Sequence, residues 1–172
     1  MKTIKFLPLF LLFVLASCSS VRVNADYDKK ATFDSYKSYA YLKSGIDKVE
    51  ISELDKKRIL YAIDDVMTTK GFTKSENPDI LISFFTTERE RVDVYNSFGL
   101  GWGWNPYWGM GYSYPVSSTE GTLILDFIDA KTKELIWQGQ GTGYLTQNVD
   151  KKDARVKEFV SKILEQYPPT KK

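Results

Sequence analysis

Two segments with helical spacing of apolar residues flank a block of strand-like segments, and this arrangement limits the possible folds more than any other feature. The first helix is expected to begin at Ser52 and to stop at Lys70-Gly71, and the second to run from about Lys151 to Tyr167. Strands are expected at 36–42, 80–87, 121–129 and 135–144, the last two as a hairpin. The alternation of the charged stretch 88–94 indicates a more exposed extension of the second strand. The order β-α-β-β-β-α predicts an α+β two-layer sandwich: a four-stranded, mostly antiparallel sheet with both helices on one face.

The core of this sandwich is expected to come from the inward positions of both helices and two central strands. These positions are Ile63, Val66, Ile80, Ile82, Phe84, Leu123, Leu125, Phe159 and Ile163. The glycines of Gly139-x-Gly141-x-Gly143 lie inside an alternating strand rather than at a strand-to-helix turn. This position favours a bulge, rings packed over the strand or a close backbone approach over a phosphate loop.

Composition excludes several classes of chemistry. The chain has 172 residues, 42% of them hydrophobic and 27% charged, which suits one globular domain. It contains no histidine and one cysteine, so histidine-dependent catalysis, histidine-ligated metals, an intramolecular disulfide and cysteine-rich zinc sites are excluded. A net charge of +2 lacks the basic excess of nucleic-acid binders. Asp126 is expected to diverge from Asp129 and Asp64 from Asp65, whereas Glu88 and Glu90 share a strand face in a pattern typical of solvated strands. No cofactor is expected apart from a covalent lipid.

The N-terminus has the layout of a secretory signal. Lys2 and Lys5 precede an apolar run at 6–15, which is too short to span a bilayer as a helix. The sequence Leu-Ala-Ser-Cys at 15–18 resembles the lipobox of bacterial lipoproteins. That resemblance implies cleavage between Ser17 and Cys18 and acylation of Cys18 with palmitate-type chains, which together give stable anchoring. The alternative is an ordinary signal peptide that happens to contain a cysteine.

Processing would divide the chain into a signal peptide at 1–17, a lipidated tether at 18–24 and a single domain at 25–172. Removal of the signal takes away Lys2 and Lys5 and leaves equal numbers of basic and acidic residues. Ser19 follows the cysteine, where an Asp would retain a lipoprotein at the inner membrane. The resemblance therefore implies an outer-membrane lipoprotein that faces the periplasm.

A segment rich in glycine and aromatic residues, at 96–118, is expected to form a loop. Its part from Phe98 to Tyr114 holds three of the four tryptophans and five glycines, too many for a helix. Rings with polar handles suit a bilayer headgroup layer, an envelope protein or a glycan, and the candidate contact residues are Trp102, Trp104, Tyr107, Trp108, Tyr112 and Tyr114. The segment lacks the Lys and Arg of a nucleic-acid platform. The alternative is a cover for the open sheet face.

Several short motifs are similar to an envelope lipoprotein family catalogued as domain of unknown function 4136. They are Asp26-Tyr27-Asp28, Tyr36-Lys37-Ser38-Tyr39, Lys70-Gly71-Phe72, Asn77-Pro78-Asp79-Ile80, Glu120-Gly121-Thr122-Leu123, Asp129-Ala130-Lys131-Thr132, Ile136-Trp137-Gln138-Gly139 and Tyr167-Pro168-Pro169. The resemblance covers nearly the whole mature chain. It implies an envelope lipoprotein and no known activity.

Two function classes remain open from the sequence. The first is a non-catalytic binding or structural lipoprotein, anchored in the membrane by Cys18, that uses the aromatic loop as its contact surface. The second is a hydrolase, or a carrier of small molecules or lipids, whose pocket is closed by the same loop. A concave pocket with converging polar groups would favour the second class.

Overall fold

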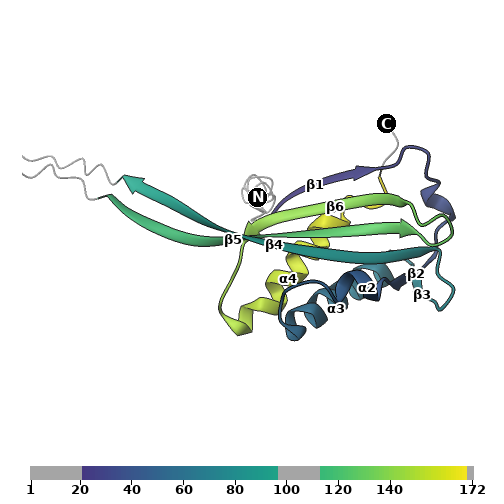
Figure 1. Ribbon diagram of the computed structural model, residues 1–172, viewed down its shortest axis with the longest axis horizontal. Coiled ribbons are helices and arrows are strands. Elements are labelled where there is room, and N and C mark those ends of the chain that lie inside the picture. The colour runs from purple at the N-terminus through teal and green to yellow at the C-terminus, as the bar shows by residue number, and fades with distance from the viewer. Residues whose placement is uncertain (1–20, 97–112, 170–172) are drawn as a thin grey trace, which may run out of the picture.

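A mixed sheet of six strands forms the frame of the protein (Figure 1). The computed structural model describes residues 21–96 and 113–169. The strands are β1 (Val21–Tyr27), β2 (Ser38–Tyr41), β3 (Thr73–Lys74), β4 (Ile80–Asn96), β5 (Ser113–Asp129) and β6 (Leu135–Tyr144), in the order β1-β6-β5-β4-β2-β3. Strand β2 runs parallel to β3 and β4, and the other neighbours are antiparallel.

The α+β class is confirmed, but the expected sheet of four strands is wrong by two strands. Strand β1 begins at Val21, within the range 18–24 assigned to a tether, and pairs with β6 along its whole length. Its residues alternate between apolar and polar as in a half-buried strand, so the expected tether is too long, and its partner strand lies more than a hundred residues away. Strand β3 has two residues, too few for any periodic signal.

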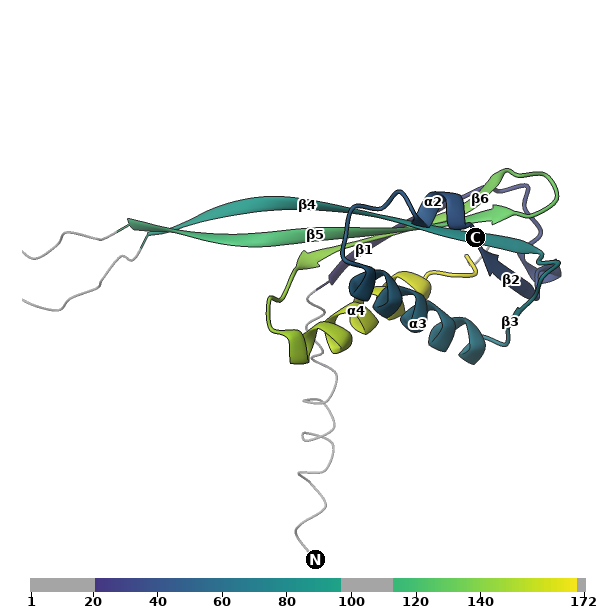
Figure 2. The same ribbon diagram turned by 60° about the horizontal axis from the view of Figure 1, so that its bottom comes forward.

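The two long helices, α3 (Glu53–Thr69) and α4 (Val149–Leu164), cover the same face of the sheet, as expected (Figure 2). A short helix, α2 (Lys43–Ile46), lies on the other face, where Gly45 sits against Ser83 of β4. A single turn of 3-10 helix, η2 (Phe33–Ser35), follows β1. We call the face opposite α3 and α4 the open face. No helix of the described residues combines the length and apolar character needed to cross a membrane.

Local signals set the helix ends. Ser52 caps α3 by accepting a hydrogen bond from the Asp55 amide at 3.1 Å, and Gly71 follows the helix with a φ of +84°, which suits glycine. Helix α4 begins at Val149, slightly before the expected start, because Asn148 caps it by accepting from the Asp150 amide at 2.9 Å. Both expected helices are therefore confirmed.

The core lies between the sheet and the two long helices. Eight of the nine expected core residues are buried, and Val66 is half-buried. Glycines on β6 let α4 approach the sheet: a Cβ on Gly139 would lie 2.3 Å from the Trp137 ring and 2.5 Å from Ile163. The close backbone approach expected for this strand is thus confirmed, with the Trp137 ring packed over Gly139.

An aromatic cluster closes the core at one end of the sheet. Trp137 of β6 lies 5.0 Å from Phe127 of β5 and 5.3 Å from Tyr167, measured between ring centres. Tyr167 follows α4 and also meets Phe33 at 5.9 Å, so the cluster joins the C-terminal segment to η2. Trp137 and Tyr167 are almost completely buried.

Candidate functional site

Strands β4 and β5 continue past the rest of the sheet as a two-stranded arm (Figure 1). Strand β6 pairs with β5 as far as Glu120, and Leu145 still bonds the Thr119 carbonyl. Six further β4–β5 pairs follow, from Arg91↔Ser118 to Asn96↔Ser113. We call these residues, 91–96 and 113–118, the arm; at 3.4 Å per residue it reaches about 20 Å beyond the sheet.

All but one of the site residues predicted from the sequence lie outside the described residues. Ser17 and Cys18 fall outside the described residues, as do Trp102, Trp104, Tyr107, Trp108 and Tyr112. Tyr114 lies on β5, where its backbone pairs with Tyr95 of β4. Strand β5 starts at Ser113, so part of the range 96–118 expected to be a loop is strand. The chain between Asn96 and Ser113 joins the two strands of the arm.

The first described residue, Val21, lies at the same end of the sheet as the base of the arm. Val21 pairs with Gly143 of β6, Gly143 pairs with Gly121 of β5, and Gly121 pairs with Glu88 of β4. Glu88 is three residues before the arm. The N-terminal end of β1 and the base of the arm therefore lie at the same end of the sheet.

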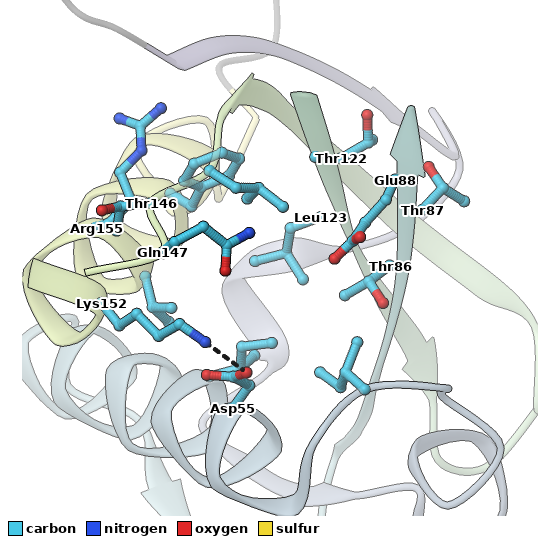
Figure 3. A pocket seen from close by; sticks show the side chains of 16 residues that line it. Asp55, Thr86, Thr87, Glu88, Thr122, Leu123, Thr146, Gln147, Lys152 and Arg155 are labelled. Carbon is cyan, nitrogen blue, oxygen red and sulfur yellow. Dashed lines mark hydrogen bonds and ion pairs between the residues drawn. The ribbon is translucent and has the colours of Figure 1, made fainter. Parts of the chain in front are cut away.

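A cavity of about 180 Å³ opens at the base of the arm, between β4, β5 and the starts of both long helices (Figure 3). Its walls are mostly apolar, and Ile59, Leu123 and Phe159 form the buried part. Thr86 and Glu88 face Lys152 and Gln147 across the opening, whereas Thr87 and Thr122 point away from it. The side chain of Leu145 rests on Gly121, where a Cβ would lie 2.6 Å from it, and closes one side.

Asp55, at the mouth of this cavity, is paired with two cations. Lys152 bonds Asp55 at 3.3 Å, and Arg58 bonds the same carboxylate at 2.8 Å. Burial raises the pKa of Asp55, but hydrogen bonds from Ser52 and Arg58, with the charge of Lys152, outweigh it and hold the pKa below its ordinary value. Arg155 stacks on Phe159 at 4.7 Å and donates to the Tyr144 carbonyl at 2.8 Å. Asp55 is therefore held in its charged form, and the positive and negative charges at the mouth nearly cancel.

The other polar clusters have structural roles. Tyr39 and Tyr41 of β2 donate to one oxygen of Asp64 on α3, at 2.8 and 2.6 Å, and Lys74 bonds the other oxygen at 2.6 Å. Burial, and then the bonds to Asp64, raise the pKa of both tyrosines well above the ordinary value. These bonds tie β2 to α3.

The carboxylates of β5 diverge, as the sequence predicted. Asp126 bonds Gln138 at 2.7 Å on the open face, and burial raises its pKa above the ordinary value. Asp129 instead accepts from Tyr36 at 2.9 Å and from the amides of the following turn. Among the described residues, no group of three or more Cys, Asp or Glu is arranged to hold a metal ion.

The residues of the cavity mouth are the part of the site that the sequence did not indicate. Lys152 and Arg155 come from α4, Asp55 from α3 and Glu88 from β4, so no short motif contains them. The one local pattern among the cavity residues is that Lys152 and Val156 are four positions apart and therefore lie on one face of α4. The same spacing occurs on solvent-exposed helix faces.

Comparison with known proteins decides the family. The model of a domain of unknown function, DUF4136, matches residues 23–169, which is most of the chain. The chain belongs to the DUF4136 family. No curated protein matches it. The family assignment confirms the resemblance and brings no activity with it.

Two solved structures share the fold of this DUF4136 protein. A PDZ domain protein from Parabacteroides distasonis is 18% identical with a TM-score of 0.54, over 89% of this chain and 37% of its own. The PelC dodecamer from Paraburkholderia phytofirmans is 10% identical with a TM-score of 0.50, over 84% of this chain and 95% of its own. The DUF4136 chain thus spans little more than a third of the PDZ domain protein. At these identities the likeness concerns the fold alone.

Proposed function

We propose that this DUF4136 protein is a non-catalytic contact module, anchored by a lipid on Cys18 in the outer membrane and facing the periplasm. In this proposal the arm holds the aromatic segment between Asn96 and Ser113 against a membrane surface. The observation that carries the proposal is the arm itself, six residue pairs beside which the described part of the chain places no third strand. A two-stranded ribbon adds little to stability, so the length of the arm favours a role in reaching another surface.

Chain length supports a contact with the membrane rather than with a distant surface. Cys18 precedes Val21 by three residues, which span at most about 11 Å when extended. A lipid on Cys18 would therefore hold the base of the arm close to the bilayer, and the arm reaches about 20 Å from that base. The N-terminal end of β1 and the base of the arm lie at the same end of the sheet.

The composition of the aromatic segment supports the same partner. Tyrosine and tryptophan prefer the boundary between headgroups and acyl chains, because each has an apolar body and a polar handle. Phe98 to Ser118 contains no Lys or Arg, so attraction to anionic lipids would add nothing. We therefore expect binding to depend on the rings and to be insensitive to salt.

The alternative of a carrier or hydrolase has less support. The cavity at the base of the arm measures about 180 Å³. Pockets that enclose small-molecule ligands usually measure about 300–1,000 Å³. In Figures 1 and 2 the arm extends away from α3 and α4, whose first turns line the cavity, so the far end of the arm lies away from the opening.

Replacement of Trp102, Trp104 and Trp108 by Ser tests the contact role. In a Cys18→Ser background, where no lipid contributes, we expect sedimentation with neutral phosphatidylcholine vesicles to fall by about tenfold while the unfolding midpoint hardly changes. The reason is that in this proposal the rings bind at the interface and add nothing to the core. Vesicle co-sedimentation and circular dichroism measure the two quantities.

A matched control removes three exposed apolar side chains elsewhere, Leu54, Tyr61 and Val149, which are 63%, 65% and 66% exposed. Replacing these three by Ser should leave vesicle binding unchanged. A large loss of stability in the tryptophan variant, with vesicle binding unchanged, would show that the aromatic segment covers the sheet instead.

Cys18→Ser tests the anchor. The thiol is the single cysteine of the chain and closes the lipobox-like motif, so its loss should abolish incorporation of a fatty-acid analogue and release the protein from the membrane fraction. Metabolic labelling followed by fractionation measures both. Labelled Cys18→Ser protein in the membrane fraction would contradict the assignment, and Ser17→Ala serves as the conservative control.

A further inference from the structure

Strand β4 has a long free edge beside the cavity. On its outer side β4 pairs with β2 at Ile80–Ile82, and the last backbone bond there runs from the Leu42 amide to the Ile82 carbonyl at 2.8 Å. From Ser83 to Asn96, no described strand pairs with that side. The connection from α2 to α3 passes around this edge from the open face to the helix face (Figure 2). Since its Ile51 lines the cavity near Thr86, the free part begins at about Thr87.

An unpaired edge presents amide and carbonyl groups that can bind an added strand. A strand added to β4 would point alternate side chains to the helix face, on which the cavity opens beside Thr86 and Glu88. The cavity of about 180 Å³ is close in size to a cavity of about 150 Å³ that holds one benzene molecule. One aromatic or branched aliphatic side chain therefore fits it.

The charges of β4 disfavour a second copy of β4 as the occupant. The sequence from 88 to 91 reads Glu-Arg-Glu-Arg. When two identical edges pair antiparallel about a two-fold axis, each residue faces itself or one an even number of positions away. In registers centred on residue 88, 89 or 90, a Glu faces a Glu or an Arg faces an Arg, which destabilises the pair, and no register brings a Glu of this stretch opposite one of its Arg residues.

The same charges indicate the chemistry of a partner. On the open face, Arg89 pairs in register with Glu120, and Glu120 also bonds Arg22. One carboxylate thus lies beside two arginines and bonds one of them, which leaves an excess of positive charge at this position. An acidic side chain opposite Arg89 would balance this excess, directly next in sequence to the side chain that enters the cavity.

We propose that the free edge of β4 and the cavity beside it bind an extended segment of another protein, which adds as a strand. The segment carries an aromatic or branched aliphatic residue for the cavity and a neighbouring acidic residue for Arg89. Main-chain bonds to the edge hold the segment, and the cavity selects the anchoring residue. This site is separate from the aromatic segment of the arm, and it stands or fails independently of the membrane contact.

Random peptides of about ten residues, displayed on phage and selected on the purified full chain, test this site. The selected peptides should share an acidic residue next to an aromatic or branched aliphatic one. Val156→Trp, which fills the cavity, should weaken their binding by about tenfold or more. Val149→Trp, on an exposed position of the same helix, should leave the affinity within about twofold.

A second measurement does not depend on the folding of any variant. Peptides that are N-methylated at one position at a time should lose affinity at every second position, because an added strand donates alternate amides to the edge. Failure to select such peptides, equal binding to Val156→Trp, or no period of two would overturn the proposal. So would a dimer in light scattering that Val156→Trp dissociates, since the occupant would then be a second copy.

Discussion

Gly139→Val is expected to lower the free energy of unfolding by about 3 kcal/mol and the melting temperature by about 10 °C. A Cβ at this position would lie 2.3 Å from the Trp137 ring and 2.5 Å from Ile163 of α4, and neither is the end of a flexible side chain. The helix would have to move away from the sheet. Strands in general prefer valine to glycine, so a loss of stability on this change would indicate the close packing at Gly139.

Gln140→Val is the matched control, because residue 140 lies on the same strand and its side chain is exposed. Thermal unfolding followed by circular dichroism should find this variant as stable as the parent or slightly more stable. Equal stability of the two variants would contradict the close approach of α4 to β6.

Regular, local features of the fold were predictable from the sequence. Helix α3 follows its apolar stripe, begins after a Ser52 cap and ends at Gly71, all of which are short-range signals. The charged extension after residue 87 was also expected to continue as a strand, and β4 runs to Asn96. In each case the chemistry of a few neighbouring residues decides the structure.

Features that depend on distant partners were not predictable. Strand β1 alternates Val21, Val23 and Ala25 with polar residues, which fits a strand, but only its pairing with β6 sets its register and its place at the edge of the sheet. Strand β5 starts at Ser113 rather than at 121, because a partner strand is present along all of 113–118. Neither fact can be read from the residues of the strand alone.

The candidate site likewise has one part that the sequence indicated and one part that it did not. The aromatic segment and Cys18 stand out in composition, which is why the sequence singled them out, although they lie outside the described residues. The cavity joins residues of β4, β5, α3 and α4 that no spacing relates. Its size depends on how far the helices stand from the sheet at the base of the arm, and only packing sets that distance.

Trp137→Ala is expected to cost about 3–5 kcal/mol of stability, the largest effect of any single truncation in this core. The Trp137 side chain is fully buried, and its ring contacts Phe127, Tyr167 and the space above Gly139. Its removal would leave a cavity where the C-terminal segment meets the sheet. Chemical denaturation should therefore find a lower midpoint with a two-state transition.

Trp137→Phe separates packing from hydrogen bonding at the same position. The Trp137 indole N–H is buried and makes no hydrogen bond among the described residues, so the phenyl ring loses some contact area and no bond. We expect Trp137→Phe to cost less than half of what Trp137→Ala costs. Leu135→Ala, on the same strand with 48% of its surface exposed, should cost less than about 1 kcal/mol. Equal losses for Trp137→Phe and Trp137→Ala would show that the indole N–H, rather than the ring, stabilises this end of the core.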